Sequence, residues 1–167
     1  MMKKNLDSEL KKSSSLADIF EVVKCAVLES EKKSRGGLML GLADLGNHPR
    51  GWMGAFFPVG TNIIVMNRIP LIRIKETNPD LYKPYTFHVL LHEYVHTLGW
   101  IDEDLTRAKV LEISTNVFGE DHIVTKMARD TTPYFPNLVY PNVTWQPEDL
   151  KIELVENFDR SSVCYIG

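Results

Sequence analysis

Two histidines four residues apart, with a glutamate beside the first, lie in the middle of the chain as His92-Glu93-Tyr94-Val95-His96. On an α-helix, residues four apart lie on the same face, so both imidazoles can reach one cation. Neutral imidazoles are good ligands for Zn²⁺, and a catalytic zinc site needs a third protein ligand and an open position for water. Glu93 lies about 100° around the helix from His92, outside the ligand set but near the water. The spacing therefore predicts a zinc site with Glu93 as general base.

The residues around this motif have the periodicity of a helix. Apolar side chains recur every three or four positions in a stripe made of Phe87, Leu90, Leu91, Tyr94 and Leu98. Thr86 is a candidate N-cap, and Gly99 is a candidate C-terminal stop. The stripe predicts one buried side of the helix, with the histidines at its edge beside a cleft. His88, one turn before His92, could line the cleft or orient a ligand, but we predict a hydrogen-bonded or solvated side chain.

The motif and the residues after it, HEYVHTLG followed by Trp100-Ile101-Asp102, resemble the active-site helix of the zincin metallopeptidases. Counted from His92, H-E-x-x-H-x-x-G-x-x-D is similar to the metzincin consensus, with Asp102 in place of the third histidine as in snapalysin-type peptidases. The chain also resembles the archaeal minigluzincins, whose third ligand is a glutamate on the next helix. This resemblance covers about residues 63–118. It implies a zinc metallopeptidase that hydrolyses peptide or protein substrates.

Four residues remain open as the third zinc ligand. The resemblance favours Asp102, six residues after His96 across a glycine turn, although Asp102 is also well placed to cap the next helix. Glu112 lies on that helix as a gluzincin glutamate does, but no Asn-Glu pair precedes it. Glu103 shares the argument for Asp102 with less support from the pattern, and His122 has a suitable nitrogen but lies farther along the chain. We predict Asp102, with Glu112, Glu103 and His122 as alternatives.

The rest of the sequence predicts an α+β fold. A helical stripe from Leu16 to about Lys33 is expected to pack behind the motif helix. Three apolar runs broken by turn residues predict a three-stranded, mainly antiparallel sheet, and they span residues 38–45, 52–57 and 62–68. In zincins the last such strand is an edge that pairs with substrate, and a central strand is the alternative. An irregular segment is expected over 69–84, and further helices are expected over about 102–118 and 120–130.

These elements predict a single zincin-like domain over residues 15–132. A flexible leader is expected over residues 1–14, and an extended tail over 133–167 is expected to wrap the domain. The tail either completes the core, which we favour, or covers the cleft as in the latent minigluzincins, with Asp159 or Cys164 near the metal. Three residues are candidates for stabilising an oxyanion, namely Tyr134, Tyr140 and His122.

Composition limits the partners that we expect. The 167 residues carry a net charge of −3, which predicts no nucleic-acid partner. The polar amino terminus and the lack of a long apolar run predict neither export nor a membrane span, so we expect a cytoplasmic protein with free thiols at Cys25 and Cys164. The alternative function is a catalytically inactive zincin-fold protein that binds metal or acts as a scaffold. Glu93 favours the enzyme, since a purely structural metal site does not need it.

Overall fold

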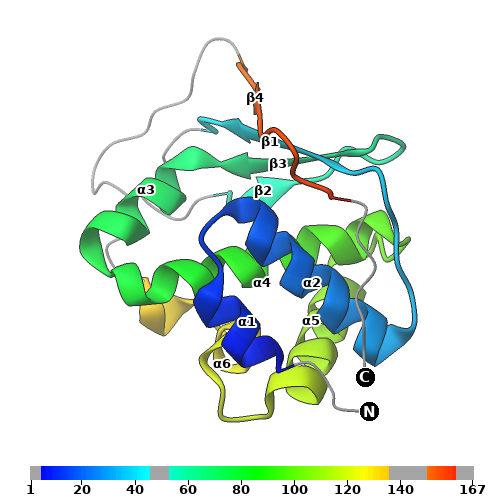
Figure 1. Cartoon of the computed structure of the whole chain (residues 1–167), viewed down its shortest axis with the longest axis vertical. Coiled ribbons are helices and arrows are strands. Elements are labelled where there is room, and N and C mark those ends of the chain that lie inside the picture. Colours follow the sequence, from blue (N-terminus) through cyan, green and yellow to red (C-terminus); the bar gives the residue numbers. More distant parts are fainter. Residues whose placement is uncertain (1–4, 46–52, 136–149, 161–167) are drawn as a thin grey trace.

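The computed structural model describes residues 5–45, 53–135 and 150–160, which form an α+β fold (Figure 1). In these ranges six α-helices lie along one side of a small four-stranded mixed sheet. The helices are α1 (Leu6–Lys12), α2 (Leu16–Glu31), α3 (Arg68–Thr77), α4 (Tyr82–Thr97), α5 (Glu103–Phe118) and α6 (Ile123–Arg129). Two short 3₁₀ helices, η1 (Pro79–Leu81) and η2 (Thr132–Tyr134), complete the helical elements of this part of the chain.

The sheet contains the three strands that the sequence predicts and one that it does not. Its strands are β1 (Met39–Ala43), β2 (Ala55–Phe56), β3 (Ile63–Asn67) and β4 (Glu153–Leu154), in the order β2-β3-β1-β4. One pair departs from the mainly antiparallel sheet that the sequence predicts, because β1 pairs with β3 in parallel, with Met39 opposite Ile63. The other two pairs are antiparallel. Since β3 has a neighbour on each side, it is a central strand and not an edge that could pair with substrate.

The segment after β3 is helical, whereas the sequence predicts an irregular segment there. Asn67 caps α3 by accepting a hydrogen bond from the Ile69 backbone N–H at 3.2 Å. Pro70 lies in the first turn of α3, where its missing N–H leaves no intrahelical hydrogen bond unmade. Asn67 is itself buried, and its side-chain amide donates to the Met53 carbonyl at 2.9 Å. The cap therefore ties the start of α3 to the loop before β2.

The first residues also differ from the predicted flexible leader. Asn5 accepts a hydrogen bond from the Ser8 backbone N–H at 3.0 Å and caps α1. Leu6 and Leu10, four residues apart on one face of α1, are both buried in the core. Two apolar residues among many charged ones are too few to predict a helix from the sequence. Their burial in the core stabilises α1.

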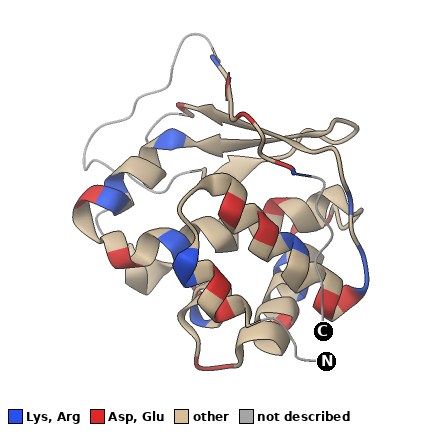
Figure 2. Cartoon of the chain, in the orientation of Figure 1, with Lys and Arg blue, Asp and Glu red and all other residues tan. Residues whose placement is uncertain are grey.

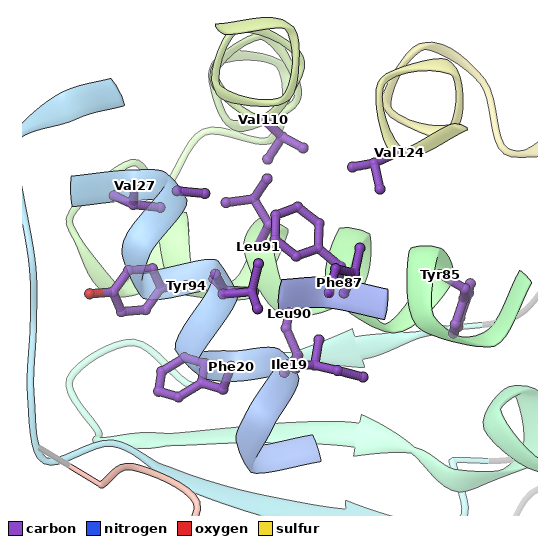
Figure 3. Close-up of a cluster of buried hydrophobic side chains, with 14 of the residues drawn as sticks. Ile19, Phe20, Val27, Tyr85, Phe87, Leu90, Leu91, Tyr94, Val110 and Val124 are labelled. Atoms are coloured by element: carbon purple, nitrogen blue, oxygen red, sulfur yellow. The ribbon is translucent and has the colours of Figure 1, made fainter. Parts of the chain in front are cut away.

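The core forms around α4, which packs against α2, α5 and α6. Figure 3 shows its buried side chains meeting those of α2 on one side and those of α5 and α6 on the other. Phe20 of α2 contacts the Tyr94 ring edge-on, with 5.4 Å between ring centroids. Phe87 contacts Phe118 of α5 in the same way at 5.2 Å. The helix predicted to lie behind the motif helix is therefore α2, and burial on both sides fixes the orientation of α4.

The described part of the tail is held against α2 and β1. Phe158 is buried and stacks on Phe20, with 4.2 Å between ring centroids. Asp159 accepts a hydrogen bond from Lys24 Nζ at 2.8 Å and another from the Leu38 backbone N–H at 3.2 Å. The carboxylate of Asp159, considered above as a group near the metal, is thus part of a buried ion pair with α2. Residues 153–160 complete the fold beside α2 and the sheet.

Charged residues of both signs are distributed over the helices (Figure 2), and several form ion pairs within or between helices. In the described ranges no helix is both long and apolar enough to cross a membrane. Cys25 is disulfide-bonded, so the predicted free thiol at this position is wrong. Cys164 lies outside the described residues. The cytoplasmic location stays a prediction.

Candidate metal centre

His92 and His96 lie in the last turns of α4, and Glu103 opens α5 directly opposite them. The Nε2 atom of His92 is 3.0 Å from Glu103 Oε2, and the Nε2 atom of His96 is 2.8 Å from Glu103 Oε1. The two imidazole rings meet at 78°, with 4.8 Å between their centroids. Within the described residues, these three form a group whose ligand atoms all lie within 4.8 Å of one another. Two nitrogens and a carboxylate are a donor set that Zn²⁺ prefers.

A tight turn between α4 and α5 produces this arrangement. Gly99 has a φ of 111°, in the left-handed region that favours glycine, and its N–H donates to the His96 carbonyl at 3.1 Å. Asp102 then caps α5 by accepting a hydrogen bond from the Leu105 N–H at 2.9 Å. Because Asp102 is the N-cap, Glu103 is the first helical residue. The turn thus places the first turn of α5 against the last turn of α4.

The hydrogen bond of His96 Nδ1 determines which nitrogen of the neutral ring has the proton. Nδ1 of His96 is 2.7 Å from the carbonyl oxygen of Trp100. A carbonyl only accepts, so Nδ1 donates, and the lone pair of the neutral ring lies on Nε2. This lone pair faces a Glu103 carboxylate oxygen, which is also an acceptor. In this tautomer two acceptors face each other at 2.8 Å, an unfavourable contact that a second ring proton or a bound cation would relieve.

Burial and neighbouring charges shift the pKa values of the site carboxylates. Glu93 is only 6% exposed, and burial raises the pKa of its carboxyl group to about 7; the charge of His96 opposes this rise, and that of Glu103 adds to it. The pKa of Glu103 is lowered; its partial burial acts against this shift, but the two histidines favour the carboxylate. Glu103 is therefore ionised at neutral pH.

Burial also acts on the histidines of α4. It lowers the pKa of His92, against the opposing effect of Glu103, and the charge of His96 lowers it further. Burial is the main cause that lowers the pKa of His88 to about 4, with a smaller contribution from His92. Nδ1 of His88 is buried without a hydrogen-bond partner among the described residues, so the predicted hydrogen bond or solvation is not seen at that atom. A neutral His92 has a lone pair for a metal, as a ligand needs.

Of the four candidates for the third ligand, the structure brings Glu103 to the histidines. Asp102, the preferred candidate, caps α5 instead. Glu112 binds Lys109 at 2.9 Å. His122 caps α6, accepting from the Val124 N–H at 3.1 Å, and its Nε2 is 2.7 Å from an Asp7 oxygen. The signal for Glu103 in the sequence is the cap itself, since a capping Asp102 leaves the following residue in the first turn of α5.

Neither of the two described candidates for the oxyanion stabiliser belongs to this group of residues. Tyr134 lies in η2, with its ring centroid 6.5 Å from that of Phe135. His122 is engaged with Asp7, as described above. Tyr140 lies outside the described residues.

A cavity of about 450 Å³ lies at the other end of α4. Its lining residues come from the α1–α2 connection, from the start of α2, from β1, from α3 and from the start of α4, where Tyr82 and Lys83 border it. His92 and His96 are two to four turns farther along α4, so this cavity is separate from the candidate metal centre.

The chain matches no model of a known protein family, no curated protein and no solved structure.

Proposed function

We propose that the protein is a zinc-dependent metallopeptidase of the zincin type, in which His92, His96 and Glu103 hold the metal. The observation that carries this proposal is the contact between His96 Nε2 and the Glu103 carboxylate, with His96 Nδ1 held by the Trp100 carbonyl. A divalent cation satisfies both groups at once, and His92 Nε2 supplies a further donor 3.0 Å from the same carboxylate. The donor set and its convergence thus fit Zn²⁺.

Glu93 supplies the proton transfers of peptide hydrolysis in this proposal. Bound zinc contributes Lewis acidity, which polarises the scissile carbonyl and makes a water molecule more acidic. Glu93 follows His92 on α4 and is buried, so its carboxylate is poorly hydrated, and the charges of His96 and Glu103 act on it. It accepts a proton from the attacking water and passes that proton to the leaving amine. This division of roles explains why a carboxylate that is not in the metal-binding group adjoins it.

The substitution Glu93→Gln tests the proposal most simply. It keeps the size and hydrogen-bonding capacity of the side chain but removes its basicity, so we expect one bound zinc per chain and loss of cleavage of a denatured protein such as casein. The loss should be about a hundredfold or more, the usual value of a general base. Glu76→Gln is the matched control, because Glu76 is exposed on α3 and is not part of the site; it should cleave like the wild type.

Two results would count against the peptidase. Undiminished cleavage by the Glu93→Gln variant would remove Glu93 from the reaction. A wild-type protein that binds zinc but cleaves no peptide would instead be the catalytically inactive metal-binding protein considered above.

A further inference from the structure

We infer that Thr106 is a positioning residue for His96: through the Trp100 carbonyl, its hydroxyl holds the imidazole with the proton on Nδ1 and the lone pair on Nε2. The inference rests on the proposed role of His96 as a metal ligand. Thr106 lies in the first turn of α5, is fully buried, and does not belong to the metal-binding group.

The Trp100 carbonyl is the acceptor that both side chains share. His96 Nδ1 is 2.7 Å from this oxygen, and Thr106 Oγ1 donates to it at 2.9 Å. A carbonyl oxygen has two lone pairs, so the two donors fill its capacity. The single proton of this hydroxyl is shared with the Asp102 carbonyl, 2.8 Å from Thr106 Oγ1, and the oxygen lies 3.4 Å from His96 Nδ1. The hydroxyl therefore fixes the carbonyl between the end of α4 and the start of α5.

The ring of Trp100 is held as well as its carbonyl. Lys33, just after α2, lies over the indole with its Nζ 4.3 Å from the ring centroid, and Lys109 of α5 lies over it at 5.4 Å. Cation–π contacts of this kind stabilise a fixed ring position. Lys109 is in turn paired with Glu31 and Glu112. The ring of Trp100 is thus held by Lys33 and Lys109, and its carbonyl, which accepts from His96, is held by Thr106.

The charge of Glu103 explains why His96 needs the hydrogen bond to a fixed Trp100 carbonyl. In the metal-free protein, the carboxylate 2.8 Å from His96 Nε2 favours a proton on Nε2, because a neutral ring can then donate to it. A proton there would block the nitrogen that is to bind the metal. The Trp100 carbonyl opposes this tautomer by accepting from Nδ1, as outer partners of metal-binding histidines do. Loss of the Thr106 hydroxyl frees the carbonyl to move, so the Nε2-protonated form gains population.

The test is the tautomer of His96 in the metal-free full-length protein, measured by the nitrogen chemical shifts of its ring at a pH where histidine is neutral. In the wild type we expect the proton on Nδ1. Thr106→Val, which replaces the hydroxyl by a methyl group, should shift population to the Nε2-protonated form, and Thr106→Ser should restore the wild-type signals. Thr115→Val is the matched control, because Thr115 on the same helix donates only to the Leu111 carbonyl four residues back; it should leave His96 unchanged.

Zinc affinity supplies a second readout. Thr106→Val should lower it by about tenfold, in the range seen for outer partners of metal ligands, while Thr106→Ser and Thr115→Val stay near the wild type. A folded Thr106→Val with the wild-type tautomer would overturn the inference. A wild-type protein whose neutral His96 has its proton on Nε2 would also overturn the inference. This measurement needs no variant, so it tests the inference even if Thr106→Val does not fold. A wild type that shows the expected tautomer but binds no zinc would instead contradict the proposed function.

Discussion

At the scale of single residues, the chemistry of the site depends on which of two neighbouring carboxylates faces the histidines. Asp102 and Glu103 are adjacent in sequence, but Asp102 caps α5 and Glu103 contacts both imidazoles. Consecutive residues of a helix point about 100° apart, so a shift of the helix start by one residue would exchange their roles. The sequence predicts that His92, Glu93 and His96 share one helix, because their spacing fits its pitch, and all three lie on α4. It cannot choose the third ligand, which depends on the N-cap and the turn at Gly99.

The pair of variants Glu103→Ala and Asp102→Ala separates ligand from cap. We expect Glu103→Ala to lower zinc affinity by about a hundredfold or more, since even an outer partner of a ligand is worth 10–100-fold. Asp102→Ala should leave affinity nearly unchanged and lower the free energy of unfolding by about 1 kcal/mol through loss of the cap. Zinc competition with a chelator and urea unfolding measure the two effects. The reverse pattern, with affinity lost on Asp102→Ala, would make Asp102 the ligand.

His88 predicts a pH dependence of stability. Its folded-state pKa of about 4 lies below the ordinary value of 6.5, so between these values the unfolded chain binds more protons than the folded one. Stability from this residue is therefore lost as the pH falls from about 6.5 to about 4. In metal-free protein, His88→Met should lose less unfolding free energy over this interval than the wild type, as urea unfolding at several pH values would show. Equal losses in the two proteins would place His88 in contact with water.

At the scale of elements, the sequence predicts α2 and α5 within two residues, because a polar cap, an apolar stripe and a C-terminal glycine or charged turn mark their ends. The sequence predicts where the first three strands lie along the chain but not how they pair. The parallel pairing of β1 with β3, and the antiparallel addition of β4 from far along the chain, depend on long-range packing that local patterns do not encode. The two buried leucines of α1 are a similar case, because a short apolar face is visible only once its partner surface exists.

The docking of the tail on α2 can be tested at Phe158. This ring is buried and stacked on Phe20, so Phe158→Ala should lower the free energy of unfolding by about 3 kcal/mol, the usual cost of removing a buried aromatic side chain. Leu150→Ala is the control, since Leu150 is 53% exposed and its loss should change stability little. Urea unfolding measures both. Equal, small effects would mean that the tail is not part of the core.

At the scale of the whole molecule, the proposed ligands come from two helices joined by one short turn. A metal bound to α4 and α5 together should therefore stabilise the fold, by about 4 kcal/mol when free zinc is a thousand times its dissociation constant. Thermal unfolding should shift upward with added Zn²⁺ and return to the metal-free value with a chelator. His96→Ala should abolish the shift. A shift of the same size in that variant would mean that zinc binds elsewhere.

X-ray absorption at the zinc edge of the zinc-loaded protein tests the central claim most directly, with the Glu103→Ala variant measured beside it. We expect one zinc bound by two imidazole nitrogens and at least one oxygen, with zinc–nitrogen distances of about 2.0–2.1 Å. The second spectrum should show loss of the carboxylate or loss of the metal. A zinc without two imidazole neighbours, or a spectrum unchanged by Glu103→Ala, would contradict a metal centre built from His92, His96 and Glu103.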